Sequence, residues 1–124
     1  MLPFRVDFTA GEPVSEQVVY AVKKALIAGT LQPGDRFPSV RTLSQELRIN
    51  PNTAHKIVAT LTTDGILEVQ PGIGTLVNHA PSVSSTQRGE LLEKDLEHLV
   101  VEARNLRLTL AEVTEALHHH WKTL

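Results

Sequence analysis

Apolar residues follow different periods in different parts of the chain, and each period predicts a different element. Between Val14 and Gly29 they recur every three or four residues, at Val14, Val18, Val22, Ala25 and Leu26. This spacing predicts an amphipathic helix that ends at the glycine. Residues 1–12 show no sustained period, so we expect them to form a loosely ordered N-terminal arm.

Two shorter helices are predicted next, after a connection that contains the turn pair Pro33-Gly34. Ser39 can cap the first of them, which buries Val40, Leu43 and Leu47. Asn50 suits the cap of the second, and Pro51 suits its first position, where a missing N–H costs nothing. The second helix buries Ile57, Val58 and Leu61. Two helices joined by a few residues have the spacing of a helix-turn-helix.

A β-hairpin is predicted after Asp64-Gly65, where the helical period stops. Extended segments over 66–69 and 75–78 flank the turn sequence Pro71-Gly72-Ile73-Gly74. The expected fold class is therefore mainly α with a small β-hairpin, and we expect 13–78 to form a winged helix-turn-helix domain. Residues 79–89 are rich in serine, threonine and proline and predict a linker.

The segment 90–122 carries an apolar stripe whose spacing alternates between four and three residues. The stripe consists of Leu92, Leu96, Leu99, Ala103, Leu106, Leu110, Val113 and Leu117. Such a heptad pattern predicts helices that form a dimer interface, because so short a segment has little of its own chain to pack on. Thr109 and Glu112 have capping-box spacing, so the dimerisation segment is either one bent helix or two helices.

Composition narrows the class of protein. No segment approaches the ~18 apolar residues needed to cross a bilayer, and no signal-like start is present, so we expect a soluble, cytoplasmic protein without a membrane partner. The chain has no cysteine, which excludes disulfides and cysteine-bound metal.

The net charge of −2 is unevenly distributed. Residues 1–80 carry seven basic and seven acidic side chains, and 81–124 carry five and seven. Between 36 and 56, Glu46 is the single acid against Arg36, Arg41, Arg48 and Lys56. A local basic patch of this kind favours contact with a polyanion.

The start of the third predicted helix has the chemistry of a DNA-reading surface. Free backbone amides at a helix start favour a phosphate, asparagine can pair with adenine, and a threonine methyl can contact thymine. For base edges we expect contacts from Asn52, Thr53 and His55. For the DNA backbone we expect contacts from Arg41, Asn50 and Lys56.

An ordered series of local motifs runs through 13–78. They are Gly29-Thr30-Leu31, Pro33-Gly34-Asp35, Pro38-Ser39-Val40-Arg41, the helix opening at Asn50, Asp64-Gly65-Ile66-Leu67, and Gly72, Gly74 and Thr75. Together they resemble the DNA-binding domain of the GntR family of bacterial transcription regulators. The opening Asn50-Pro51-Asn52-Thr53 and the short helical tail look like the YtrA-like subfamily of short dimeric regulators. The resemblance implies DNA contacts at Arg41, Asn52, Thr53, His55 and, in the wing, Gly72.

Several positions depart from the family pattern. His55 stands where relatives commonly have arginine, and Arg48 stands where they often have glycine. Pro71 and Ile73 occupy wing positions that are basic or polar in many relatives. A wing tip without arginine or lysine should hold phosphate less firmly. We therefore expect weaker and more salt-sensitive binding per protomer, with dimerisation making up part of the difference.

No cofactor, metal or catalytic site is predicted. The run His118 to Trp121 contains three histidines, but consecutive histidines on a helix point in different directions. Phosphate-loop and nucleophile-elbow sequences are absent. We predict a sequence-specific DNA-binding transcription regulator, a repressor that acts as a homodimer on a near-palindromic operator. The alternatives left open are a winged-helix protein-interaction module without effective DNA binding and a sensor of an unidentified small molecule.

Overall fold

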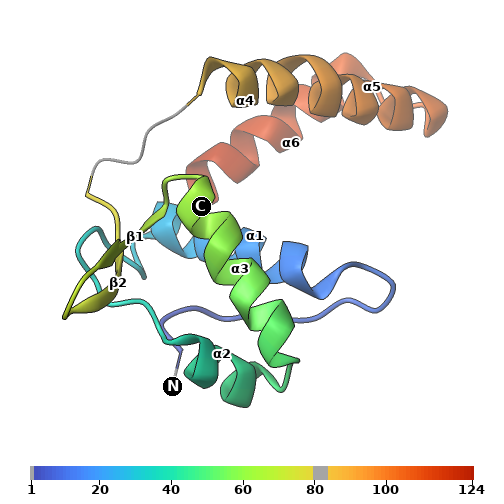
Figure 1. Cartoon of the computed structure of the whole chain (residues 1–124). Helices are drawn as coiled ribbons and strands as arrows, with labels where there is room; N and C mark the ends of the chain where they lie inside the picture. Colours follow the sequence, from blue (N-terminus) through green and yellow to red (C-terminus); the bar gives the residue numbers. More distant parts are fainter. Residues whose placement is uncertain (1, 80–83) are drawn as a thin grey trace. The chain divides into compact units, whose positions relative to one another are not determined.

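The structure is a computed structural model that describes residues 2–79 and 84–124. The chain divides into two compact units, Met1–Ser82 and Val83–Leu124 (Figure 1). The described part of the first unit holds helices α1 to α3 and a β-hairpin, and that of the second holds the remaining helices. This arrangement confirms the predicted fold class.

The first unit contains the predicted elements in the predicted order. Its helices are α1 (Val14–Ala28), α2 (Val40–Leu47) and α3 (Pro51–Thr63), and its strands are β1 (Leu67–Gln70) and β2 (Gly74–Val77). The strands pair antiparallel, with Leu67 opposite Val77 and Gln70 opposite Gly74. The expected strand boundaries over 66–69 and 75–78 were each shifted by one residue.

The ends of these helices follow the capping chemistry of the sequence. The backbone N–H of Thr42 donates to Ser39 Oγ over 3.1 Å, and that of Asn52 donates to Asn50 Oδ1 over 2.8 Å. Helix α1 ends at Gly29, whose φ of 80° is left-handed. Arg48 ends α2 with a φ of 54°, a left-handed conformation that is unfavourable for a residue with a Cβ.

A short segment of the chain before α2 pairs with the edge of the hairpin. The N–H of Val77 donates to the carbonyl of Asp35 over 2.8 Å, and the N–H of Phe37 donates to the carbonyl of Thr75 over 2.8 Å. This pairing places Phe37 in the core and fixes the approach to α2. The sequence interpretation treated this stretch as connection only.

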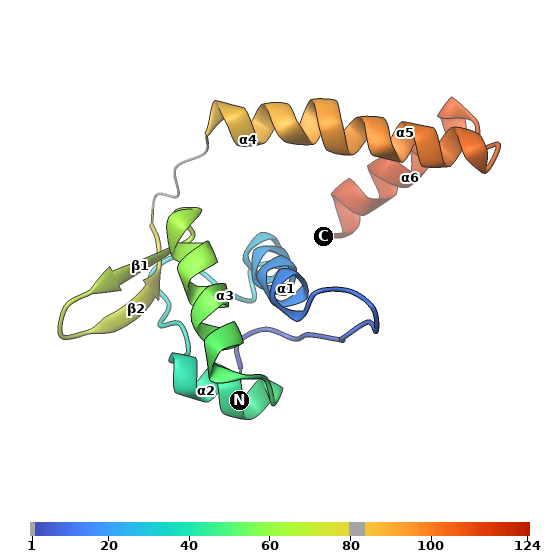
Figure 2. The ribbon, with the colours of Figure 1, turned by 45° about the vertical axis from the view of Figure 1, so that its right-hand side comes forward.

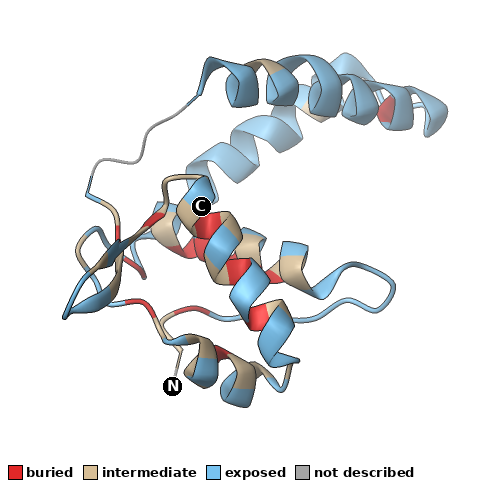
Figure 3. Ribbon diagram, viewed as in Figure 1, coloured by how far each residue is buried: buried red, intermediate tan, exposed pale blue. Residues whose placement is uncertain are grey.

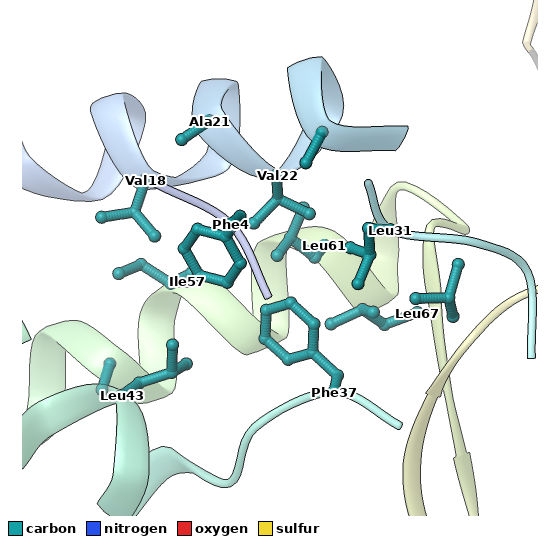
Figure 4. Packing of buried hydrophobic residues seen from close by; sticks show 13 residues of the cluster. Phe4, Val18, Ala21, Val22, Leu31, Phe37, Leu43, Ile57, Leu61 and Leu67 are labelled. Carbon is teal, nitrogen blue, oxygen red and sulfur yellow. The ribbon is translucent and has the colours of Figure 1, made fainter. Parts of the chain in front are cut away.

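The core lies between α1, α3 and the base of the hairpin (Figure 4). Its most deeply buried side chains include Val18, Val22, Leu31, Leu43, Ile57, Leu61 and Leu67. Helix α3 contributes to this core along its whole length, so its opposite face has a fixed orientation.

The start of the N-terminal segment is part of this core, so the expectation of a loosely ordered arm over 1–12 was wrong for residues 2–6, while residue 1 lies outside the described residues. Phe4 is only 7% exposed and stacks on Phe37, with ring centroids 5.8 Å apart. Leu2 and Val6 pack beside it, so alternate side chains of an extended segment face inward. Gln17 fixes the segment's other end through two hydrogen bonds with the backbone of Thr9.

The second unit begins with one continuous helical run. It comprises α4 (Ser85–Glu90), a π-helical stretch η1 (Leu91–Asp95) and α5 (Leu96–Asn105). The linker predicted over 79–89 is thus helical from Ser85, because Ser84 caps the run by accepting a hydrogen bond from the N–H of Gln87 over 3.0 Å. The part of that predicted linker at 80–83 lies outside the described residues.

The alternative of two C-terminal helices is the correct one. A second helix, α6 (Leu110–Thr123), follows a break at which Arg107 has a φ of 60°. The predicted capping box is present: the N–H of Glu112 donates to Thr109 Oγ1 over 3.1 Å, and the N–H of Thr109 donates to Glu112 Oε2 over 2.7 Å. These bonds fix the start of α6. The heptad stripe therefore continues over two separate helices and not over one bent helix.

Candidate nucleic-acid interface

Helix α3 presents a polar stripe on the side opposite its core residues. Ala54, Ile57 and Leu61 are buried, whereas the exposed residues at helical spacing are Asn52, His55, Lys56, Ala59 and Thr63 (Figure 3). Thr53 is half-buried at the side of this stripe. The sequence interpretation did not select Ala59, whose small side chain lets a surface come close to the middle of the helix.

Helix α2 is fixed against the start of α3. Ser44 Oγ donates to the carbonyl of Ile49 over 2.8 Å, and the N–H of Ile49 donates to the carbonyl of Ser44 over 3.1 Å. A shallow groove between the two helices is lined by Val40, Arg41, Ser44, Gln45, Pro51 and His55. The structure therefore brings Arg41 and His55, which were predicted from separate helices, to one groove.

Gln45 is a candidate contact that the sequence interpretation missed. It lines the groove beside Arg41 and follows that residue by four positions, one helical turn later. The i, i+4 spacing on a helix already expected to touch DNA was the available signal.

Asn50 caps helix α3, whereas its contact with DNA stays a prediction. Its Oδ1 accepts the hydrogen bond from the N–H of Asn52, so the oxygen serves the helix start. The side chain is exposed, and its Nδ2 group makes no hydrogen bond within the described part of the chain. A ligand would meet Asn50 as a donor, which suits a phosphate oxygen.

The cations around this surface are not neutralised. Arg41, Arg48 and Lys56 are exposed, and none of them forms an ion pair with any described residue. The ion pairs in the described part of the first unit join Lys23 to Asp64 over 3.9 Å and Arg5 to Asp7 over 3.5 Å. The positive charge along α2 and α3 is therefore available to a polyanion.

Gly72 lies on a different element from the helix residues. It is exposed at the tip of the hairpin with a φ of 81°, and the N–H of Ile73 donates to the carbonyl of Gln70 over 3.0 Å to close the turn. Figure 2 shows the hairpin projecting beside α3. The first unit thus has two separate exposed surfaces, the polar stripe of α3 and the wing tip.

The predicted interface residues of the second unit differ in exposure. Ala103 is buried and Val113 is half-buried, since both line the corner between α5 and α6. The exposed members are Leu92, Leu96, Leu99, Leu106, Leu110 and Leu117. A single chain therefore leaves most of the stripe uncovered by its own second unit.

The histidines of α6 and the apolarity of the helices bear on two other kinds of site. His118, His119 and His120 are exposed on α6, and nowhere in ranges 2–79 and 84–124 do three metal-ligating side chains converge. No helix in those ranges has the length and apolarity to cross a membrane.

Comparisons with known proteins agree on one class. A family model described as "Bacterial regulatory proteins, gntR family" matches residues 14–77. The chain is 28% identical over 112 residues to the HTH-type transcriptional repressor YtrA of Bacillus subtilis, an alignment that covers 90% of this chain and 86% of that protein. It is 30% identical over 115 residues to the HTH-type transcriptional regulator Rv1152 of Mycobacterium tuberculosis, covering 93% and 91%.

A solved structure extends this likeness to the fold. The protein described as a transcriptional antiterminator from Listeria monocytogenes EGD-e superposes with a TM-score of 0.81 at 22% identity, covering 94% of this chain and 88% of that one. At this identity the superposition bears on the fold alone. The named curated relatives are transcription regulators and not enzymes.

Proposed function

We propose that this chain, which belongs to the gntR family of bacterial regulatory proteins and to its YtrA-like subfamily, represses transcription as a homodimer on a near-palindromic operator. The observation that carries the proposal is the exposed polar stripe of α3 next to the groove that holds Arg41. Repression is proposed because the B. subtilis relative is named a repressor. The site of action would be the cytoplasm.

The reading residues lie on α3. Asn52 and His55 stand on the exposed stripe and Thr53 at its side, where they would contact base edges in the major groove. Arg41 and Lys56 would hold phosphates on either side, and the Nδ2 group of Asn50 would add a neutral donor. Gly72 would let the wing approach the duplex closely.

Dimerisation would occur through the second unit. The leucines that its stripe leaves exposed would be buried against a second copy, which favours association by about 25 cal/mol for each Å² of apolar surface removed from water. We accordingly assign 13–78 to DNA binding and 90–122 to dimerisation. A two-fold pair of recognition helices would meet half-sites about 10 base pairs, or a small multiple, apart.

The experiment that tests this function is selection of duplexes from a random pool by the purified protein. The expected result is that the selected duplexes share a palindromic sequence. The double variant Asn52→Ala/Thr53→Ala should then bind the selected duplex and a scrambled duplex equally, because the base contacts are gone. Its dimer dissociation constant should be that of the wild type. Unchanged discrimination by this variant would refute the assignment of the reading residues.

A protein-interaction module is the second candidate, and the wing favours it. The hairpin exposes Val69 and Ile73 and carries no basic residue. A salt series separates the two functions. DNA binding through the cations of α2 and α3 should weaken linearly in log Kd against log salt, whereas a protein-docking module should show no such loss on duplex.

A further inference from the structure

A cleft of about 580 Å³ lies between α1 and the segment that leads into it. This segment runs antiparallel to the helix (Figure 1). Gln17 joins the two near the start of α1: its Oε1 accepts a hydrogen bond from the N–H of Thr9 over 2.7 Å, and its Nε2 donates to the carbonyl of Glu12 over 3.0 Å. The volume falls within the range of about 300–1,000 Å³ that is typical of small-molecule sites.

The cleft is separate from both surfaces that the proposed function uses. None of its lining residues is among those assigned to DNA contact or to dimerisation. The loop that precedes α1 lies on the side of this helix away from α3 (Figure 2). A ligand in the cleft would therefore leave the polar stripe of α3 uncovered.

The two ends of the cleft carry opposite charges. Glu12 and Glu16 lie at the start of α1, and Lys24 lies eight residues after Glu16, which is about 12 Å further along the helix axis. Arg5 lies at the same end as Lys24, because it precedes Thr9 by four residues in the antiparallel segment. The cleft is thus acidic at one end and basic at the other.

These charged groups have few partners within the chain. Glu12, Glu16 and Lys24 form no ion pair with a residue that the structure describes. Arg5 pairs with Asp7 over 3.5 Å, but both side chains are largely exposed, so water screens the pair and it contributes little. Asp7 leaves the basic end with a net charge of one, which suits a single carboxylate.

Tyr20 lies between the two charged ends. It follows Glu16 by four residues and precedes Lys24 by four, so the three side chains share one face of α1. Its side chain is exposed, and its ring forms no aromatic pair with any described residue. A tyrosine ring has an apolar face with a hydroxyl at one end. The middle of the cleft therefore suits an apolar or aromatic group of a ligand.

We propose that this cleft binds a short extended peptide of about three residues with free termini. The ammonium group of the peptide lies beside Glu12 and Glu16, its carboxylate faces Arg5 and Lys24, and its central side chain packs on Tyr20. Three extended residues span at most about 11 Å, which matches the separation of the charged ends. This binding site goes beyond the proposed function and does not depend on it.

Other small ligands satisfy only part of the cleft. A single amino acid spans about 3.5 Å, so its two charges cannot reach both ends. A polyamine has no anionic group for Arg5 and Lys24. A dicarboxylate places one of its charges beside Glu12 and Glu16, where like charges repel each other.

The test is a nuclear magnetic resonance titration of the full chain with ¹³C-labelled tyrosine and tryptophan. Tyr20 is the only tyrosine of the sequence, so its ring signals report on the cleft. Trp121, the only tryptophan, belongs to the other unit and serves as the reference. The tripeptide glycyl-phenylalanyl-glycine should shift the Tyr20 signals with a Kd on the order of 1 mM, because exposed ion pairs are weak.

Capping one end of the tripeptide tests its orientation. The N-acetylated peptide and the C-terminal amide should each bind about threefold more weakly than the free peptide. The double variant Glu12→Gln/Glu16→Gln should bind the free and the acetylated peptide equally, because the partners of the ammonium group are gone. By the same reasoning, Arg5→Gln/Lys24→Gln should bind the free and the amidated peptide equally.

The matched control is Lys23→Gln on the same helix. Lys23 pairs with Asp64 over 3.9 Å and does not line the cleft. This variant should bind the three forms of the peptide as the wild type does. A melting curve for each variant separates lost contacts from lost folding.

Three results would overturn the inference. The first is that the Tyr20 signals do not move at about ten times the expected Kd. The second is that a peptide capped at both ends moves them as far as the free peptide, which would mean that the phenylalanine ring alone makes the contact. The third is that the double variants leave the effect of each cap unchanged. No step uses DNA, so this test can fail while the selection of duplexes succeeds, and the reverse.

Discussion

Removing the Leu99 side chain should weaken the proposed dimer without unfolding the monomer. Leu99 is 46% exposed on α5, so about half of its surface would be covered only by a partner. Full burial of a leucine side chain contributes about 1.5–3 kcal/mol, so half of it contributes about 1 kcal/mol. A two-fold interface uses each residue twice, and Leu99→Ala should therefore cost the dimer about 2 kcal/mol.

A loss of this size raises the dimer dissociation constant about 30-fold, which sedimentation equilibrium over a concentration series can measure. The matched control is Val101→Ala on the same helix. Val101 is 51% exposed, but two residues rotate an α-helix by about 200°, so it lies on the opposite face. This control variant should have the dimer dissociation constant of the wild type. If both variants dimerise as wild type does, or both weaken equally, the stripe is not the interface.

Three further substitutions, two of them paired with a control variant, test single features of the fold. Phe4→Ala should destabilise the first unit by about 3 kcal/mol, because it empties a core position, whereas Phe8→Ala removes an exposed ring and should have little effect; thermal melts of the two variants compare them. Arg48→Gly should raise the free energy of unfolding by about 0.5–1 kcal/mol, since glycine adopts the left-handed φ of 54° without strain. The variant should also lower the slope of log Kd against log salt by the contribution of about one phosphate contact. A more stable variant with an unchanged slope would mean that Arg48 does not contact DNA. Thr109→Ala should cost about 1 kcal/mol through loss of the cap of α6, visible in far-ultraviolet circular dichroism, and Thr109→Ser should keep most of the cap, so equal melts for the two would show that the capping bond contributes nothing.

The features that the sequence predicted well depend on short-range chemistry. Ser39, Asn50 and Thr109 each cap the helix expected of them, because a cap needs only a side-chain oxygen and the next turn of backbone. The stripe of α3 follows from helical period alone once Ile57 and Leu61 are assigned to the core. Local residue patterns were sufficient for the polar face.

The features that the sequence did not predict depend on partners distant in the chain. Phe4 is buried because Phe37 and α1 provide its surroundings, and one short alternation of apolar residues gives no helical signal of this packing. The segment that contains Asp35 pairs with β2, some forty residues later, through hydrogen bonds that no local period encodes. The predicted linker is helical from Ser85 although its composition is typical of a linker. Once α5 has formed, the helix can extend toward the N-terminus as far as the cap at Ser84.

The proposed interface has few charges, and this limits what one protomer can do alone. Arg41, Arg48 and Lys56 are the unpaired cations of α2, its cap and α3 among the described residues, so these two helices of one unit can neutralise about three phosphates. At about 0.9 per phosphate, log Kd should change with log salt by about 2.7 on a half-site duplex and about 5.4 on the full palindrome. Anisotropy titrations of the two duplexes between low and moderate salt measure both slopes. Equal slopes on the two duplexes would mean that only one unit engages DNA, and dimerisation would then serve some purpose other than cooperative operator binding.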